Sequence, residues 1–303
     1  MISPRRPLAG CVVGLSISES EDSTGCGFPR GQINRVTVQM VASLFGQGVG
    51  VVFGHDWRED GVMEAVYAFA RQMQSADLRS GTDAPLLQNL LPWPDQPMLP
   101  APDRERLASA LRIEQAGLPE ELSRFAGDAV EAARGRPEYD YLRARALTHL
   151  RHRLDARSHA RICVGGPRRR FQGRYPGIVE EALLTVRSGK ALYLTGLLGG
   201  ATRQVIDAVE GAPAPGDFCA PSRITQLYMN PPPEVLERST ETLRDREIAP
   251  ERVWAEFQRA GVQELARANG LTVEQNLELF HTPSLDHAVR LVLAGLSAVR
   301  RTG

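Results

Sequence analysis

The stretch "ARICVGGPRRRFQGRYPGIVEEALLTVRSGKALYLTGLLGG" (residues 160–200) decides the fold class of this chain. It begins with a short apolar run that ends in paired glycines, as buried parallel strands do. A polar loop follows, then apolar residues spaced three and four apart as in a helix, and then a second apolar run that ends in glycines. This succession of strand, loop, helix and strand predicts parallel β-strands joined by a crossover helix.

The first part of the chain repeats the same order of elements. The runs "CVVGLSIS" (11–18) and "VGVVFGHDW" (49–57) are expected strands, with a helical pattern between them and another after residue 60. An internal duplication is the simplest account. We therefore expect two α/β modules, each a parallel sheet flanked by helices: residues 1–157, and residues 158–303 with the C-terminal helices. Open sheets of this kind bind ligands beyond the carboxyl ends of their strands.

Composition narrows the class of partner. The 36 basic and 36 acidic residues leave no net charge, so we expect neither nucleic acid nor a membrane surface as a partner. The four cysteines are far apart and form no Cys-x-x-Cys pair, which favours a reduced intracellular protein without disulfides. His149 and His152 have no carboxylate or cysteine companions nearby, so we expect no metal. The N-terminus lacks a signal peptide and no apolar run is long enough to span a membrane, which predicts a soluble cytoplasmic protein.

Glycines and arginines crowd the loops after the strands of the second half. Because glycine has no side chain, backbone N–H groups in these loops can approach a phosphate, and the helix dipole favours a negative charge at that place. Tight turns alone explain the glycines as well, because no full G-x-G-x-x-G or Walker pattern is present. Arginines 168–170 form a charge run that is usually a solvated surface. Arg174 is best placed by sequence for a bidentate contact to phosphate.

Glu180 and Glu181 follow this loop at the start of the predicted helix. Acids in a first helical turn complement the helix dipole, which is worth ~0.3–1 kcal/mol each. Neighbouring helix residues point ~100° apart, so one of the two can face the loop. A helix start that offers N–H groups to phosphate and a carboxylate to ribose is typical of a nucleotide pocket. The residues expected to bind a ligand in this half are Gly165, Gly166, Arg170, Gly173, Arg174, Tyr175, Pro176, Gly177, Glu180, Glu181, Gly196, Gly199, Gly200 and Ala201.

In the first half, hydroxyls and carboxylates follow the two strands. They suit ribose or base recognition, and turn or capping chemistry is the alternative. No G-x-S-x-G elbow is present, so the serines are poor candidates for hydrolase nucleophiles. A basic helix (140–157) with Arg143, Arg145 and Arg151 either covers the pocket or forms a solvated face. The expected ligand-binding residues of this half are Gly14, Ser16, Ser18, Glu19, Gly54, Asp56 and Arg58.

The motifs resemble a known group of proteins. "GGPRRRFQGRYPGIVEEALL" followed by "GKALYLTGLLGGATRQVIDAV" resembles the second half of double-SLOG proteins, Rossmann-like modules of the SMF/DprA–LOG superfamily. "GLSISESED", "VVFGHDWREDGVMEAV" and "LLPWP" resemble the first half, so the resemblance covers most of residues 10–210. It implies binding of a nucleotide-derived ligand, of the ADP-ribose or cyclic ADP-ribose type, with no other cofactor required. Relatives occur in bacterial anti-phage systems, often beside TIR domains. The resemblance thus implies a sensor, a homodimer or higher oligomer, and a TIR or other effector partner.

The same resemblance raises an enzymatic alternative. In LOG enzymes the motif P-G-G-x-G-T-x-x-E carries phosphate-binding glycines and a catalytic glutamate, with an arginine supplied upstream. Gly177 and Glu180 or Glu181 are the matching positions, and an arginine from 168–174, Arg174 above all, is the candidate partner. The chain has Gly177-Ile178 in place of the Gly-Thr pair, and "GHDW" where Gly-Gly-Asp is usual. We therefore expect binding, with a nucleotide N-glycosidic hydrolase as the alternative. The third alternative is a DprA-like protein that binds single-stranded DNA. The absence of net charge and the small number of aromatic residues argue against it.

Overall fold

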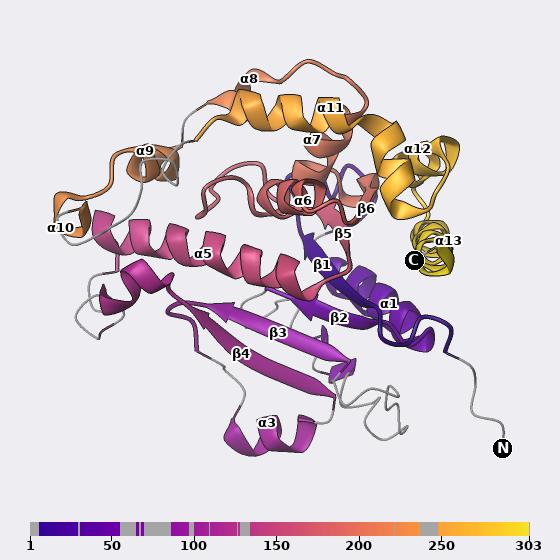
Figure 1. Ribbon diagram of the computed structural model, residues 1–303, viewed down its shortest axis with the longest axis horizontal. Helices are drawn as coiled ribbons and strands as arrows, with labels where there is room; N and C mark the ends of the chain where they lie inside the picture. The colour runs from indigo at the N-terminus through magenta and orange to yellow at the C-terminus, as the bar shows by residue number, and fades with distance from the viewer. Residues whose placement is uncertain are drawn as a thin grey trace.

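One parallel β-sheet forms the centre of the molecule (Figure 1). The computed structural model describes residues 6–29, 31–54, 65–66, 68–69, 86–96, 100–108, 110–125, 127, 134–220, 222–236 and 248–302. Within them the sheet has six strands in the order β4-β3-β2-β1-β5-β6. Their bounds are Val12–Ser18 (β1), Gly50–Phe53 (β2), Leu87–Pro92 (β3), Leu111–Gly117 (β4), Ala160–Gly165 (β5) and Ala191–Thr195 (β6).

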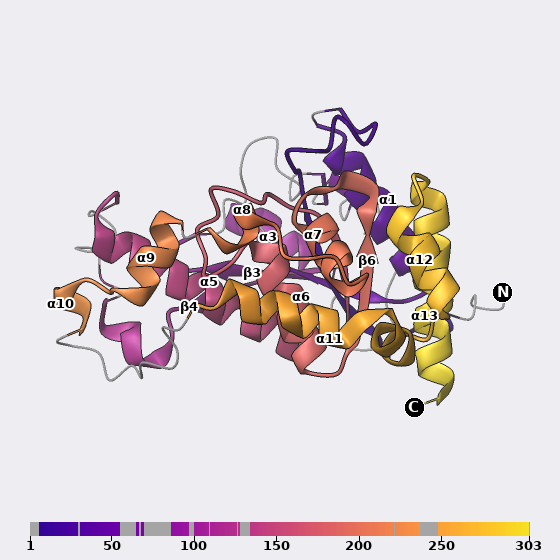
Figure 2. The ribbon, with the colours of Figure 1, turned by 90° about the horizontal axis from the view of Figure 1, so that it is seen from above.

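Helices cover both faces of this sheet (Figure 2). The α-helices are α1 (Ile33–Gly46), α3 (Ala101–Leu107), α5 (Pro137–Arg157), α6 (Gly177–Arg187), α7 (Gly200–Val209), α8 (Gly216–Cys219), α9 (Arg223–Met229), α10 (Pro233–Leu236), α11 (Pro250–Asn269), α12 (Val273–His281) and α13 (Leu285–Thr302), with 3-10 turns η1 (Glu120–Phe125) and η2 (Gly196–Leu198). None of the helices in this described part of the chain combines the length and apolarity needed to cross a membrane.

Alternating side chains of β1 separate the two faces. Val13, Leu15 and Ile17 pack into the apolar cluster formed with α1 and α13. The Ser16 side chain and a Cα hydrogen of Gly14, which alternate with them, face the other side of the sheet, where α5 and α6 lie. Side chains alternate across a strand, so a run that is buried on both faces needs helices on both. The small and polar residues of β1 leave room on the α5–α6 side for polar side chains.

The strands of the two halves belong to the same sheet. β1 pairs in parallel with β5 from Val13↔Ala160 to Ser18↔Gly165. The expected α/β class with parallel strands and flanking helices is confirmed, whereas the expectation of a separate sheet in each half is wrong. The physical reason is that β5 and β6 alone would make a two-stranded sheet, which is at best marginally stable in water. The division at residue 157 remains a prediction about domain organisation.

The strand order reverses between β1 and β5. From β1 the chain proceeds outward through β2 and β3 to β4, and it then returns through α5 to β5 on the other side of β1. Ligands of open α/β sheets bind at such a switch point, beyond the carboxyl ends of the strands. The loops that follow β1, β5 and β6 meet there.

Candidate functional site

Backbone hydrogen bonds and one carboxylate connect the loops that meet at the switch point. Gly166 N donates to the carbonyl of Ser18 at 2.9 Å, and Ala201 N donates to the carbonyl of Gly166 at 2.8 Å. At the start of α7, Gly200 N donates to the Asp22 carboxylate at 2.9 Å. The anion that this helix N-terminus attracts is thus a carboxylate from the β1–α1 loop.

Close packing of chain segments accounts for the glycines of this crevice. A Cβ on Gly165 would lie 2.3 Å from the carbonyl oxygen of Ser18, and one on Gly200 would lie 2.2 Å from that of Gly166. Gly199 has a φ of +62°, and its Cβ would lie 2.7 Å from that of Asp22. Real Cβ atoms do not approach so closely, so only glycine permits these three loops to meet. Contact of these residues with a ligand remains a prediction.

Glu180 lies in a second cluster, at the start of α6. Its side chain is 5% exposed and forms an ion pair with Arg151 of α5. Thr148 Oγ1, also on α5, donates to Glu180 Oε1 at 2.7 Å. A Cβ on Gly173 would lie 2.2 Å from Arg151 Nη1, and one on Gly177 would lie 3.0 Å from Nη2. The glycines before α6 therefore make room for this guanidinium, and the arginine beside Glu180 comes from α5 and not from the 168–174 loop.

Glu181 belongs to a different polar network, on the sheet. It accepts a hydrogen bond from Ser16 Oγ, and Arg161 Nη1 lies 3.2 Å from its Oε2. Arg161 is 1% exposed and also donates to Ser16 Oγ at 2.8 Å. A Cβ on Gly14 would lie 2.9 Å from Arg161 Cζ, so the glycine accommodates the buried guanidinium. Gly14, Ser16 and Glu181 are thus brought together around Arg161, which the sequence analysis missed. An arginine inside an otherwise apolar strand was its only signal.

A pocket of about 290 Å³ opens beside the Glu180 cluster. The guanidinium carbons of Arg145 and Arg174 lie 5.4 and 5.7 Å from the centroid of the Tyr228 ring. Tyr228 is 1% exposed. Burial raises the pKa of its phenol, which is therefore protonated at neutral pH. The lining residues are Pro119, Glu120, Glu121, Arg145, Thr148, His149, His152, Arg174 and Tyr228.

Charged groups of both signs line this pocket. Arg145 and Arg174 supply two positive charges beside the Tyr228 ring, and Glu120 and Glu121 supply two negative ones, with Glu121 Oε1 3.3 Å from Arg145 Nη2. Burial lowers the pKa of His149, with the positive charge of Arg153 as the next cause, so this imidazole is neutral at pH 7. Thr148 lines the pocket and also donates to Glu180, so this residue connects the pocket to the Glu180–Arg151 ion pair. Tyr228 on α9 escaped the sequence analysis because the proline-rich segment around it has no regular pattern.

The other predicted residues lie apart from this pocket or support the loops. Tyr175 Oη accepts from Ala249 N at 3.1 Å, and Glu19 Oε1 accepts from Gly31 N at 2.8 Å. A Cβ on Gly54 would lie 2.6 Å from Leu154 Cδ1, and one on Gly196 would lie 2.3 Å from the carbonyl oxygen of Phe280. Pro176 immediately precedes α6, and Arg170 is exposed with a φ of 56°. Asp56 and Arg58 lie outside the described residues.

Comparison with known protein families matches residues 7–279 to the family described as SLOG cluster2. No similar protein is found among curated sequences. The match extends over nearly the whole chain and includes every strand of the sheet. The family indicates binding or processing of a nucleotide-related ligand. The chain belongs to the SLOG cluster2 family.

Proposed function

We propose that the protein binds a nucleotide-derived ligand of the ADP-ribose or cyclic ADP-ribose type and does not cleave it. One observation carries this proposal: Arg145 and Arg174 converge over Tyr228 in a pocket that Thr148 joins to Glu180. Guanidinium groups recognise phosphate through paired hydrogen bonds. The Thr148 hydroxyl, whose proton goes to Glu180, lines the pocket and can accept a hydrogen bond from a ribose hydroxyl. The pocket volume is near the lower limit for a small-molecule site, so it holds the phosphate and ribose end of the ligand.

The engagement of both glutamates favours binding over hydrolysis. Glu180 is buried and already accepts hydrogen bonds from Arg151 and Thr148. Glu181 is held by Ser16 and Arg161. Cleavage of a glycosidic bond requires a carboxylate within reach of the anomeric carbon or of an attacking water. Both oxygens of Glu180 are engaged, so this glutamate would have to lose a buried partner to reach a substrate, and Glu181 turns its Oε2 toward the sheet.

A nucleotide N-glycosidic hydrolase is the second candidate function. The observation that favours it is the Glu180–Arg151 ion pair next to the glycines at 173 and 177, which unites the residue types of a catalytic Glu/Arg pair. In this alternative, movement of Thr148 would open Glu180 to the pocket. The two candidates differ in one measurable property, the release of free base.

The biological role that we propose is that of a sensor or regulatory protein in bacterial defence or signalling. Sequence resemblance supports it, as it does a homodimer or higher oligomer and a TIR or other effector partner. No cofactor other than the ligand is proposed. Sedimentation of the purified chain with and without ADP-ribose would test the oligomer, with a ligand-dependent change expected for a sensor.

Calorimetric titration with ADP-ribose and cyclic ADP-ribose isomers tests the binding site. We expect saturable binding that weakens at least tenfold in Arg174→Gln, because charged hydrogen bonds contribute about 1.5–3 kcal/mol. Arg169→Gln is the matched control, since Arg169 lies on the same loop with its side chain 75% exposed, and it should bind like the parent.

Chromatography of the same mixtures tests hydrolysis. We expect no free base or ribose phosphate. Release of base that Glu180→Gln abolishes would establish the hydrolase instead. Absence of both binding and turnover would refute the nucleotide pocket.

A further inference from the structure

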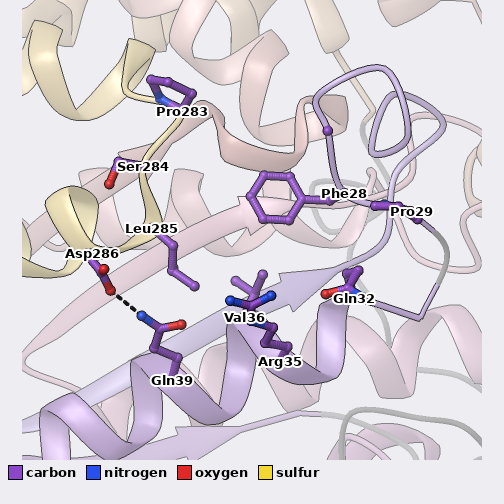
Figure 3. Close-up of a pocket in the computed structure, with 11 residues that line it drawn as sticks. Phe28, Pro29, Gln32, Arg35, Val36, Gln39, Pro283, Ser284, Leu285 and Asp286 are labelled. Atoms are coloured by element: carbon purple, nitrogen blue, oxygen red, sulfur yellow. Dashed lines mark hydrogen bonds between the residues drawn. The ribbon is translucent and has the colours of Figure 1, made fainter.

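A second pocket, of about 430 Å³, lies on the α1 side of the sheet, between α1 and the turn that precedes α13 (Figure 3). Its walls come from segments far apart in the sequence: the end of the β1–α1 loop, the first two turns of α1, and the start of α13. The lining residues are Gly27, Phe28, Pro29, Gln32, Arg35, Val36, Gln39, Pro283, Ser284, Leu285 and Asp286. None of them belongs to the site described above.

One side of this pocket is apolar and carries an aromatic ring. Phe28 and Leu285 are partly buried against the core, and Val36 is 1% exposed. Figure 3 shows the Phe28 ring projecting from its loop over the space between α1 and the turn before α13. An aromatic ring held in this way offers a stacking surface to a planar heterocycle.

Polar groups form the opposite rim. Gln32, the N-cap residue of α1, is followed at spacings of three and four by Arg35 and Gln39, so the three lie on one side of the helix. Gln39 Nε2 donates to Asp286 Oδ1 across the pocket. Asp286 Oδ2 and Gln39 Oε1 have no hydrogen-bond partner among the described residues, and neither does the Arg35 guanidinium. The rim therefore presents two adjacent acceptor oxygens and one cation.

We propose that this pocket binds a purine base that carries an exocyclic amino group, as adenosine or its 5′-monophosphate. The base stacks on Phe28, and its amino group donates to the oxygens of Asp286 and Gln39. Carboxylate and carboxamide oxygens are the acceptors that proteins use for base amino groups. Arg35 takes the phosphate. This site is separate from the pocket lined by Arg145, Arg174 and Tyr228, called the Arg174 pocket below, and goes beyond the proposed function.

A ligand in this pocket should also stabilise the folded protein. The β1–α1 loop that carries Phe28 places Asp22 on the N-terminus of α7. A ligand between this loop and the start of α13 holds two distant segments together. Binding to the folded state alone raises the melting temperature with ligand concentration.

Titration of the full chain with adenosine, inosine and adenosine 5′-monophosphate tests the proposal. Adenosine should bind at least tenfold more tightly than inosine, whose C6 oxygen would face the acceptor oxygens. The monophosphate should bind more tightly than adenosine, and Arg35→Gln should remove that difference. Phe28→Leu, which keeps an apolar side chain, should weaken adenosine at least tenfold, while Phe28→Tyr should retain it.

Arg174→Gln is the control that separates the two sites. Adenosine binding should be unchanged in it, while ADP-ribose binding at the other pocket falls. The melting temperature of Phe28→Leu without ligand checks that the variant is folded. The proposal is overturned by equal affinity for adenosine and inosine, by adenosine binding that needs Arg174 and not Phe28, or by no binding of adenosine to the parent chain.

Discussion

Two adjacent glutamates serve two separate networks. Glu180 turns toward α5 and pairs with Arg151, whereas Glu181 turns toward the sheet and pairs with Arg161. Successive residues of a helix point ~100° apart, so neighbours in sequence reach different surroundings. Each carboxylate is buried or nearly so and each has a guanidinium partner, as buried charges require. Neither glutamate acts merely as a surface charge at the N-terminus of α6.

Gly173 should be intolerant of a side chain, because Arg151 occupies the space that a Cβ needs. Gly173→Ala should lower the free energy of unfolding by about 1–3 kcal/mol, the usual cost of overpacking. Urea denaturation measures the change. Gly46→Ala is the control: a Cβ at this last residue of α1 meets nothing within 4 Å and alanine favours the helix, so no loss of stability is expected.

A double-mutant cycle then identifies the cause of the Gly173→Ala loss. In a Glu180→Gln background the guanidinium of Arg151 is held less firmly and can move aside, so Gly173→Ala should cost less. An undiminished cost would show that backbone strain and not the ion pair is responsible.

At the scale of elements, the carboxylate of Asp22 connects the β1–α1 loop to the N-terminus of helix α7. Asp22 accepts from Gly200 N at the start of α7 and also pairs with Arg168 at 2.9 Å. Asp22→Ala should therefore destabilise the protein by about 0.5–2 kcal/mol and speed amide hydrogen exchange in the first turn of α7. Thr24→Ala, at an exposed position of the same loop, should do neither. Equal exchange in the two variants would argue that the loop does not cap the helix.

At the scale of the whole molecule, both halves build one core. The apolar cluster on the α1 side joins Leu15 of β1 to Leu291 and Val292 of α13, and β1 pairs with β5 along its length. We expect the full chain to unfold in one cooperative transition. Neither fragment 1–157 nor fragment 158–303 should unfold cooperatively when expressed alone. The first would lose β5 and the α13 residues that complete its apolar cluster, and the second would retain only β5 and β6 of the six described strands. Circular dichroism during heating measures the cooperativity of unfolding of the full chain and of each fragment. A cooperative transition in an isolated fragment would instead establish independent modules.

The sequence by itself determined the units of the fold. Buried apolar runs, glycine-rich loops and helical spacing predict the order of β5, α6 and β6, because periodicity is a local property of the chain. The predicted last strand extended over 191–200, whereas β6 ends at Thr195 and the turn η2 follows it. The motifs also identified the SLOG family, and they indicated the loop and helix start beside the Arg174 pocket.

Only the tertiary structure decided how these units join and which side chains meet. Arg151 lies 29 positions from Glu180, and Ser16 lies 165 positions from Glu181. No periodicity relates residues so far apart. Their contact depends on the pairing of β1 with β5 and on the packing of α5 against α6, which bury charges that must then find partners. For the same reason two repeated units became one sheet: strands that are buried on both faces are stable only when neighbouring strands extend the sheet and helices cover it.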